Sequence, residues 1–255
     1  MYANTNENLP QPRRCRAGKK TNAVECNWCG LYGMCQVAGL NASAPGLIDK
    51  VVSRHEEVAV GQRIVTAGQS HAEIIAVRSG AFKTTVVLAN GDEQAVDFFL
   101  PGELMGLDTL SEGRSTNAIV ALEHSTICRF HLSRLYLLKE RMGDFQQQLI
   151  QALSRQTRRD QWVPLLMGAK NAEQRLALFL LGLSSRLIEH GLPSQSFRLP
   201  MSRRLIADYL GLAMETVSRV LKRFHSQGLI DVHARNIDLY NIDDLRVVAG
   251  ISAKR

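Results

Sequence analysis

The chain has 255 residues, of which 45% are hydrophobic and 22% charged, and its net charge is +7. These proportions are typical of a soluble globular protein that is long enough for two modest domains, and the positive charge fits a polyanionic partner. No apolar run approaches the roughly 18 residues of a membrane span. The polar N-terminus lacks the apolar centre of a signal peptide. We therefore expect a cytoplasmic protein with no membrane partner.

The N-terminal segment, residues 1–45, is predicted to be cysteine-rich and metal-binding. The chain has five cysteines, and three of them follow the spacing Cys26-x2-Cys29-x5-Cys35. In a reducing compartment, such crowding indicates metal or redox chemistry rather than disulfides. Four thiolates can hold an iron–sulfur cubane or a structural zinc ion, and a loop that supplies three of them needs a distant fourth. Cys15 lies in the polar lead-in, and we interpret it as a free thiol.

Residues 46–132 are predicted to form an antiparallel β-roll or barrel. Short apolar or alternating runs recur there, and glycines separate them. The triplet Asn90-Gly91-Asp92 between two such runs is typical of a tight hairpin turn, because that backbone needs a positive φ.

A long helix is predicted over residues 133–168, where glycine is scarce and the apolar period becomes helical. Its heptad-like stripe is typical of a dimer seam, although the same stripe could pack on its own domain. Asp160 lies on the stripe, where two copies would bring like charges together and weaken the dimer. Pro164 should kink the helix near its end. The predicted dimer contacts are Phe145, Leu149, Ala152, Gln156, Asp160 and Val163.

Residues 169–255 are predicted to form a winged helix-turn-helix. A strongly apolar helix at 171–190 comes first. Ser202 then fits the N-cap of a second helix, and Gly211 allows a tight turn into a third. Two short strands within 229–240 can pair as a wing.

The third of these helices has the pattern of a DNA recognition helix. Its apolar residues share one face, and Glu215, Ser218 and Arg219 project from the other near the N-terminal end, which enters the major groove. Arginine can donate two hydrogen bonds to guanine, glutamate can accept one from cytosine, and serine can contact a base or a phosphate. Phosphate contacts position such a domain without specifying sequence. The residues expected to make them are Arg203, Arg204, Lys222 and Arg223.

The motif Glu215-Thr216-Val217-Ser218-Arg219 resembles the recognition-helix signature of the FNR branch of the CRP/FNR transcription regulators. The stretches NAEQRL, from Asn171, and LPMSRRLIADYLGLAMETVSRVLKRF, from Leu199, are similar throughout. The resemblance covers nearly the whole chain. It implies an α+β fold: an N-terminal antiparallel β-roll of the cyclic-nucleotide-binding type, a long dimerisation helix and a C-terminal winged helix-turn-helix.

The same resemblance implies an oxygen-responsive regulator. The cysteine spacing matches the family's sensor pattern. In that family the fourth ligand lies on a segment resembling residues 121–130, which makes it Cys128 here. The implied cofactor is a [4Fe-4S] cluster held by Cys26, Cys29, Cys35 and Cys128. The cluster would promote homodimerisation and binding to a TTGAT-N4-ATCAA-like palindrome without oxygen, with two recognition helices about 34 Å apart. RNA polymerase would then be contacted through roll loops such as 79–92 and 110–118.

Two alternatives keep the fold but change the ligand: a zinc-stabilised regulator and a cyclic-nucleotide sensor. The nucleotide pocket needs an acid for the ribose and an Arg-Ser/Thr pair for the phosphate. Aligned on Gly106, the acid is replaced by Leu107, and Arg114-Ser115 comes about three residues early. Glu103, Asp108 and Arg114 are instead expected in a solvated loop.

An enzyme is not expected from this sequence. The seven histidines are scattered without metal-ligand spacing, and the sequence contains neither a G-x-S-x-G motif nor a P-loop.

Overall fold

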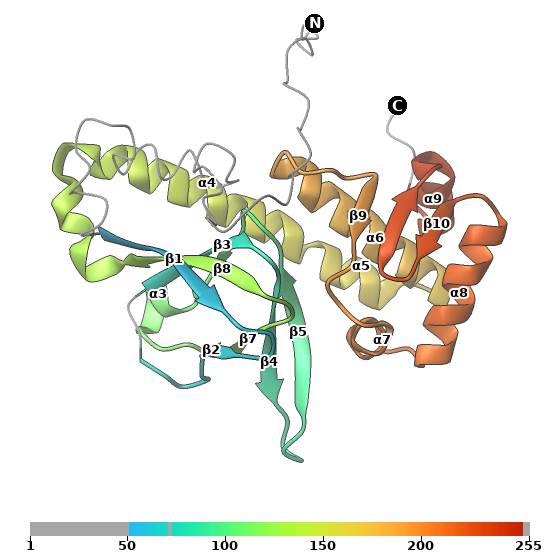
Figure 1. The fold of residues 1–255 in the computed structure, drawn as a ribbon, viewed down its shortest axis with the longest axis horizontal. Helices are drawn as coiled ribbons and strands as arrows, with labels where there is room; N and C mark the ends of the chain where they lie inside the picture. The colour runs from blue at the N-terminus through green and yellow to red at the C-terminus, as the bar shows by residue number, and fades with distance from the viewer. Residues whose placement is uncertain (1–50, 71–72, 252–255) are drawn as a thin grey trace, which may run out of the picture.

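The structure is a computed structural model that describes residues 51–70 and 73–251 (Figure 1). Its N-terminal half is a β-roll, as predicted. The strands are β1 (Val52–Val58), β2 (Arg63–Val65), β3 (Glu73–Ser79), β4 (Phe82–Val87), β5 (Glu93–Phe99), β6 (Leu104–Met105), β7 (Ala118–Ala121) and β8 (Ser125–His131), with the short helix α3 (Thr109–Glu112) before β7.

Two antiparallel four-stranded sheets make up the roll, with the strand orders β1-β8-β3-β6 and β2-β7-β4-β5. Both sheets supply the apolar side chains of one buried cluster, which includes Ile75, Phe82 and Ile127. The predicted hairpin turn joins β4 to β5. Gly91 there has a φ of +86°, and the amide of Leu88 donates to the carbonyl oxygen of Asp92 at 2.8 Å. The prediction of an antiparallel roll is confirmed.

The predicted long helix consists of three parts: a 3-10 segment η3 (Leu132–Arg141), the helix α4 (Met142–Asp160) and the helix α5 (Trp162–Gly168). The interruption falls at Gln161. Pro164 explains it, since a proline has no amide to donate to the carbonyl oxygen of Asp160 four residues earlier. The helix is therefore interrupted near its end, as expected from the position of Pro164.

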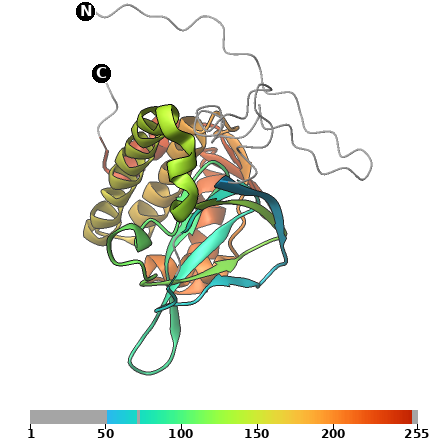
Figure 2. The same cartoon turned by 90° about the vertical axis from the view of Figure 1, so that its left-hand side faces the viewer.

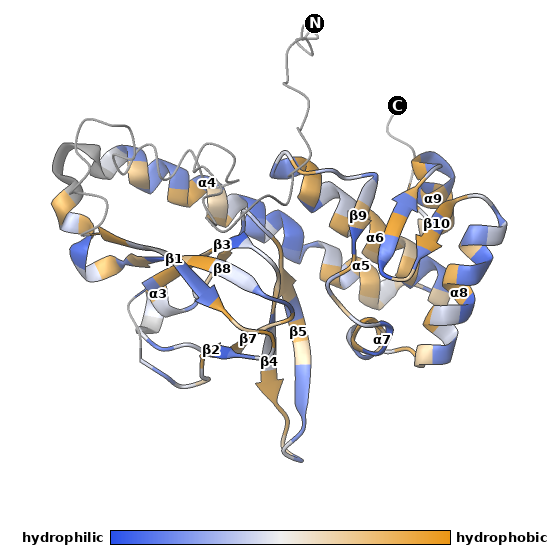
Figure 3. Ribbon diagram, viewed as in Figure 1, coloured by the Kyte–Doolittle hydropathy of each residue, from blue (hydrophilic) through white to orange (hydrophobic). Residues whose placement is uncertain are grey.

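Helix α4 covers the outer face of the first sheet, and the helices gather on one side of the roll (Figures 1 and 2). Phe145 of α4 is 1% exposed and lies in one apolar cluster with Ile74 and Phe130. The rings of Phe130 and Phe145 are 6.0 Å apart between centroids. Hydrophilic and hydrophobic residues alternate along α4 (Figure 3), and its most apolar stripe is the one that packs on the sheet.

This packing corrects part of the predicted dimer seam. Phe145, Leu149 and Ala152 contact the apolar cluster of the roll, and Gln156 lines a small cavity beside Glu103. Phe145 is 1% exposed and Ala152 9%, so these two side chains have little surface left for a second copy, whereas Leu149 and Gln156 are half-buried and stay predicted seam residues. For Phe145 and Ala152 the burial favours the alternative, in which the stripe packs on its own domain, because the outer face of the sheet beneath them is itself apolar.

The C-terminal half contains α6 (Ala172–Glu189), β9 (Ser196–Arg198), α7 (Arg203–Leu210), α8 (Met214–Ser226), β10 (Ile230–His233), β11 (Asn236–Leu239) and α9 (Ile242–Ala249). The three strands form one sheet in the order β10-β11-β9. Its two-stranded wing was predicted, but the third strand, β9, was not. Asn171 caps α6 by accepting a 2.8 Å hydrogen bond from the amide of Gln174.

The two halves share one hydrophobic core. Phe98 of β5 and Leu100 belong to the same buried cluster as the inner faces of α6 and α8. Phe98 packs against Tyr209 of α7 with 4.9 Å between ring centroids, and Phe179 of α6 packs on the same tyrosine at 5.9 Å. Among the described residues, no helix is both long and apolar enough to cross a bilayer.

Candidate nucleic-acid interface and sensor site

The helix-turn-helix forms as its residues predict. Ser202 caps α7 by accepting a hydrogen bond from the amide of Leu205 at 3.2 Å. Gly211 adopts a φ of +63° at the end of α7, a left-handed conformation that a residue with a side chain rarely adopts. The turn brings in α8, which buries Val217, Val220, Leu221 and Phe224.

The outer face of α8 collects the predicted base-reading residues. Glu215 and Arg219 are exposed and Ser218 is half-buried, all within the first two turns. Arg219 donates a hydrogen bond to the hydroxyl of Thr216 at 3.3 Å, which holds the guanidinium beside the helix. The structure therefore brings these three side chains together on one exposed surface, with donors and acceptors that suit base edges.

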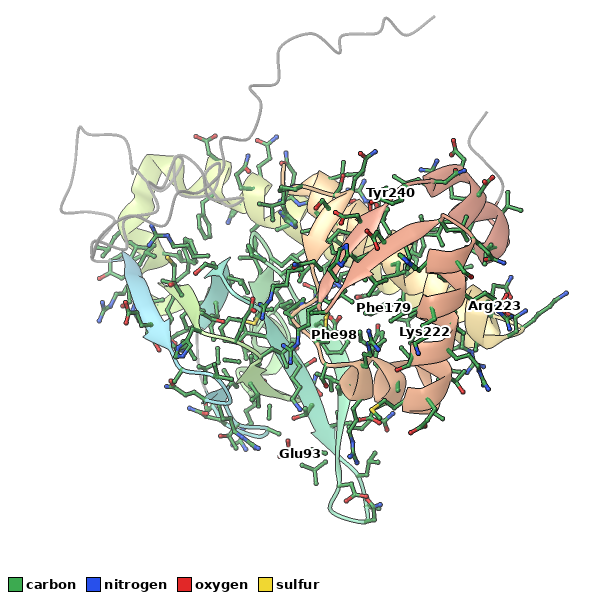
Figure 4. The ribbon with its side chains drawn as sticks, turned by 45° about the vertical axis from the view of Figure 1, so that its right-hand side comes forward. Glu93, Phe98, Phe179, Lys222, Arg223 and Tyr240 are labelled. Carbon is green, nitrogen blue, oxygen red and sulfur yellow. The ribbon has the colours of Figure 1, made fainter. Side chains whose placement is uncertain are left out.

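The predicted phosphate-contacting residues differ in their surroundings. Arg203 and Arg204 are exposed at the start of α7, and Lys222 is exposed on α8 (Figure 4). Arg223 instead forms an ion pair with Glu173 in the first turn of α6. The sequence analysis did not anticipate this partner. A carboxylate in the first turn of a helix is itself a recognisable signal, because it complements the helix dipole.

A cluster of polar side chains connects the end of α8 to the wing. Asp231 of β10 lies 2.9 Å from His225 at the end of α8 and 2.9 Å from His233 in the wing. A hydrogen bond from the backbone amide of Val232 and these two imidazoles lower the pKa of Asp231 below its ordinary value. Sequence reasoning treated both histidines as scattered; the wing pairing brings them together.

Cys128 is the one predicted cluster ligand within the described residues. It lies on β8, opposite Ala76 of β3, and is half-buried. Its side chain packs against the apolar cluster that contains Phe145, and Leu149 of α4 packs against the same cluster. Cys26, Cys29 and Cys35, like Cys15, lie outside the described residues. Within residues 51–70 and 73–251, no three or more His, Cys, Asp or Glu side chains come together in a way that could hold a metal ion. A soft, half-buried thiol in apolar surroundings suits an iron–sulfur centre.

The loop expected to be solvated is largely buried, which corrects the interpretation of Glu103 and Asp108. Glu103 is 7% exposed and forms ion pairs with Arg159 and Arg186. Burial alone would raise the pKa of Glu103, but the two guanidiniums outweigh it and hold that pKa below its ordinary value. Asp108 is half-buried and accepts hydrogen bonds from the amide and the hydroxyl of Thr116 at 2.7 and 2.9 Å.

The ribose position of a nucleotide pocket is apolar in this roll. Leu107 packs against the cluster beneath α4, so no carboxylate is available there. Arg114, of the Arg-Ser pair, is exposed, and Ser115 donates a hydrogen bond to the carbonyl oxygen of Asn117 at 2.8 Å. Of the polar groups that a cyclic nucleotide would need, the acid is therefore missing and the hydroxyl of Ser115 is already used.

Both halves of the chain match known domain families. The model of the Crp-like helix-turn-helix domain matches residues 174–248, and that of the cyclic nucleotide-binding domain matches residues 55–141. The transcriptional activator protein FnrA of Stutzerimonas stutzeri is 36% identical over 227 residues, which cover 89% of this chain and 93% of that protein. The fumarate and nitrate reduction regulatory protein of Escherichia coli strain K12 is 35% identical over 228 residues, covering 89% and 91%.

Solved structures show the same architecture. FixK2 from Bradyrhizobium japonicum matches with a TM-score of 0.59 at 29% identity, over 80% of this chain and 100% of its own. A CooA mutant from Carboxydothermus hydrogenoformans matches with a TM-score of 0.62 at 19% identity, over 80% of this chain and 90% of its own, which is evidence for the fold alone.

Proposed function

The chain belongs to the FNR branch of the CRP/FNR family of transcription regulators, and from this premise we propose that it is an oxygen-responsive DNA-binding regulator whose dimer forms when a [4Fe-4S] cluster is bound. The DNA-binding part of the proposal is carried by three side chains on the outer face of α8, opposite its buried face: Glu215, Ser218 and Arg219. The position of Cys128 beneath α4 carries the sensing part.

In the proposed complex, α8 enters the major groove of a TTGAT-N4-ATCAA-like palindrome. Arg219 donates to a guanine, Glu215 accepts from a cytosine, and Ser218 contacts a neighbouring base or phosphate. Arg203, Arg204 and Lys222 contact phosphates and set the register of the helix in the groove. Arg223 joins them only by exchanging Glu173 for a phosphate, so we expect its contribution to be smaller.

The cluster would be held by Cys26, Cys29, Cys35 and Cys128. When bound, such a cluster supplies an oxygen-sensitive redox centre that ties four thiolates together. Cys128 then anchors the N-terminal cysteines to the sheet face on which Phe145 and Leu149 pack. Loss of that anchor alters the support beneath α4, and through it the surface that α4 offers to a partner.

The dimer surface lies on the outer side of α4 and α5. Side chains exposed there follow spacings of three and four, as a coiled-coil seam requires. Ile150 is 62% exposed and Met167 is 60% exposed, and the Asp160 side chain is 61% exposed on the same stripe. The residues of this revised seam are Ile150, Leu153, Thr157, Asp160, Pro164 and Met167. Val163, from the original prediction, is exposed beside it.

Asp160 makes the dimer easy to dissociate. In a parallel pair of helices the two carboxylates face each other, and their repulsion has to be offset by apolar contacts along the seam. Asp160→Ala should therefore dimerise and bind DNA in air. A monomeric Asp160→Ala variant in air would contradict the repulsion argument.

The deciding experiment is the quantitation of iron and acid-labile sulfide in anaerobically purified protein, with DNA binding measured before and after exposure to air. We expect about four irons per chain, an absorption band at roughly 400 nm, and loss of palindrome binding in air. A colourless protein with one zinc per chain would support the zinc-stabilised alternative instead. Cys128→Ala should lose iron and palindrome binding, whereas Cys15→Ala, the matched control, should keep both.

Contact with RNA polymerase completes the proposal. The hairpin between β4 and β5 projects from the body of the roll (Figure 1), and Val87 and Leu88 near its tip are exposed. We propose that loops 79–92 and 110–118 reach the polymerase when the dimer is bound beside a promoter in the cytoplasm. Substitution of Val87 should then lower transcription without changing DNA affinity.

A further inference from the structure

Four charged side chains converge where the roll meets the DNA-binding domain. Glu103 is the centre: its carboxylate accepts from Arg186 Nε at 2.7 Å and Nη2 at 2.6 Å, and from Arg159 Nη1 at 3.3 Å. Arg159 also donates to Asp97 at 2.6 Å, and its guanidinium lies 4.7 Å from the ring centre of Phe99. Two carboxylates and two guanidiniums thus balance in a largely buried cluster.

The four residues come from three different parts of the fold. Asp97 and Glu103 belong to the roll, Arg159 to the last turn of α4, and Arg186 to α6, the first helix of the DNA-binding domain. Arg186 also donates to the backbone carbonyl of Phe98 at 2.5 Å. Apolar packing surrounds the cluster, since Phe98 of β5 and Phe179 of α6 lie close together at this junction (Figure 4).

The ion pairs of this junction fix the orientation of α6 on the roll, which apolar packing alone would not do. Apolar surfaces can slide past one another at small cost, but a guanidinium that binds a carboxylate through two nitrogens holds it in one orientation. Helix α6 packs against α8 and α9, so its orientation on the roll sets the orientation of the recognition helix. Arg159 directly precedes Asp160, so the dimer seam and the junction meet in a single helical turn.

We propose that Arg159 and Arg186 are positioning residues for DNA recognition: by converging on Glu103, they hold the end of α4 and helix α6 in one orientation on the roll, so that the two recognition helices of a dimer match the spacing of the palindrome. This inference rests on the proposed function as a dimeric DNA-binding protein. It adds that the fit to a whole palindrome depends on a junction that contacts neither the DNA nor the partner subunit.

The test compares binding to the full palindrome with binding to a single half-site. A dimer binds the full site more tightly because the second recognition helix is already at the right distance. Arg186→Met should lower this full-to-half-site ratio by about tenfold, while half-site affinity and the dimer dissociation constant stay within about twofold of the unsubstituted protein. Arg159→Met should lower the ratio by a similar factor at protein concentrations that keep it dimeric, because Arg159 Nε also lies 3.7 Å from the Asp160 carboxylate and its loss weakens the dimer as well. Arg158→Met, which removes an exposed cation from the same turn of α4, is the matched control and should change the ratio little.

Three results would overturn the inference in a folded variant: an unchanged ratio, an equal loss of half-site and full-site affinity, or, for Arg186→Met, a dissociated dimer. If either methionine variant fails to fold, Asp97→Asn, at the more exposed edge of the cluster, replaces it and should lower the ratio about threefold. Arg159→Lys keeps the charge but not the forked geometry, and should restore the ratio only in part.

A readout without DNA separates this inference from the proposed function. Hydrogen exchange should become faster in residues 98–104 and 183–190 of Arg186→Met, and remain unchanged in Arg158→Met. If the unsubstituted protein shows no preference for the full site, the proposed function fails, and the exchange data alone decide whether the junction holds α6. Unchanged exchange in Arg186→Met would refute the junction itself.

Discussion

Replacing Phe145 by alanine tests which face of α4 packs on the roll. The side chain is 1% exposed and contacts the ring of Phe130. Removing a buried phenylalanine side chain from a core typically costs about 3–5 kcal/mol, which includes the cavity left behind. For a chain of this size each kcal/mol lowers the melting temperature by about 2–4 °C, so we expect a decrease of about 6–20 °C.

The assay is thermal unfolding followed by circular dichroism, in air and at low protein concentration, so that dimerisation does not contribute. Ile150→Ala is the matched control, because Ile150 lies on the same helix but is 62% exposed. It should change the free energy of unfolding by less than about 0.5 kcal/mol. Under anaerobic conditions the same substitution should weaken the dimer, measured by sedimentation equilibrium.

The opposite pattern would refute this reasoning. If Phe145→Ala melted like the unsubstituted protein and failed to dimerise, while Ile150→Ala melted early and remained dimeric, the stripe that packs on the roll and the stripe that faces a partner would have to be exchanged. The originally predicted seam would then be correct.

Three further predictions follow from the junction, the DNA-binding surface and the backbone. Arg219→Ala should weaken binding to the palindrome by about 1–3 kcal/mol and relax the preference at one base pair. Lys222→Ala should weaken binding to all DNA sequences alike and reduce the slope of log affinity against log salt concentration by about 1. Titrations of base-substituted duplexes at several salt concentrations distinguish the two variants. The pKa of Glu103 is below its ordinary value of 4.5, so its charge stabilises the fold above pH 4.5 and this contribution is lost as the pH falls further. Glu103→Gln should therefore flatten the loss of stability below that pH, and an acid limb as steep as before would contradict the assignment. Gly102→Ala should lower the free energy of unfolding in urea more than Gly91→Ala does. Both glycines have a positive φ, but only at Gly102 would the new Cβ lie 2.5 Å from the imidazole of His190, while Gly91 faces open space. Equal decreases in the two variants would exclude a role for that contact.

Much of the site could be predicted from local residue patterns. The cap at Ser202, the left-handed turn at Gly211 and the outward position of Arg219 all depend on neighbours within a few residues. Helical periodicity decides which side chains share a face, and capping and turn preferences decide where an element begins and ends. The hairpin at Gly91 was predictable for the same reason.

Which surface each face contacts could not be predicted in this way. The apolar stripe of α4 indicated burial, but a period of three and four residues does not distinguish a partner helix from the sheet beneath. Glu103 was expected in solvent because its partners, Arg159 and Arg186, lie more than fifty residues away along the chain. The sequence by itself determined most of the elements and which side chains of α8 face outward, but it did not show the division of the long helix or the strand β9. Only the tertiary structure decided which apolar stripe remains outside and which charges are buried together, because both depend on long-range packing that no local pattern records.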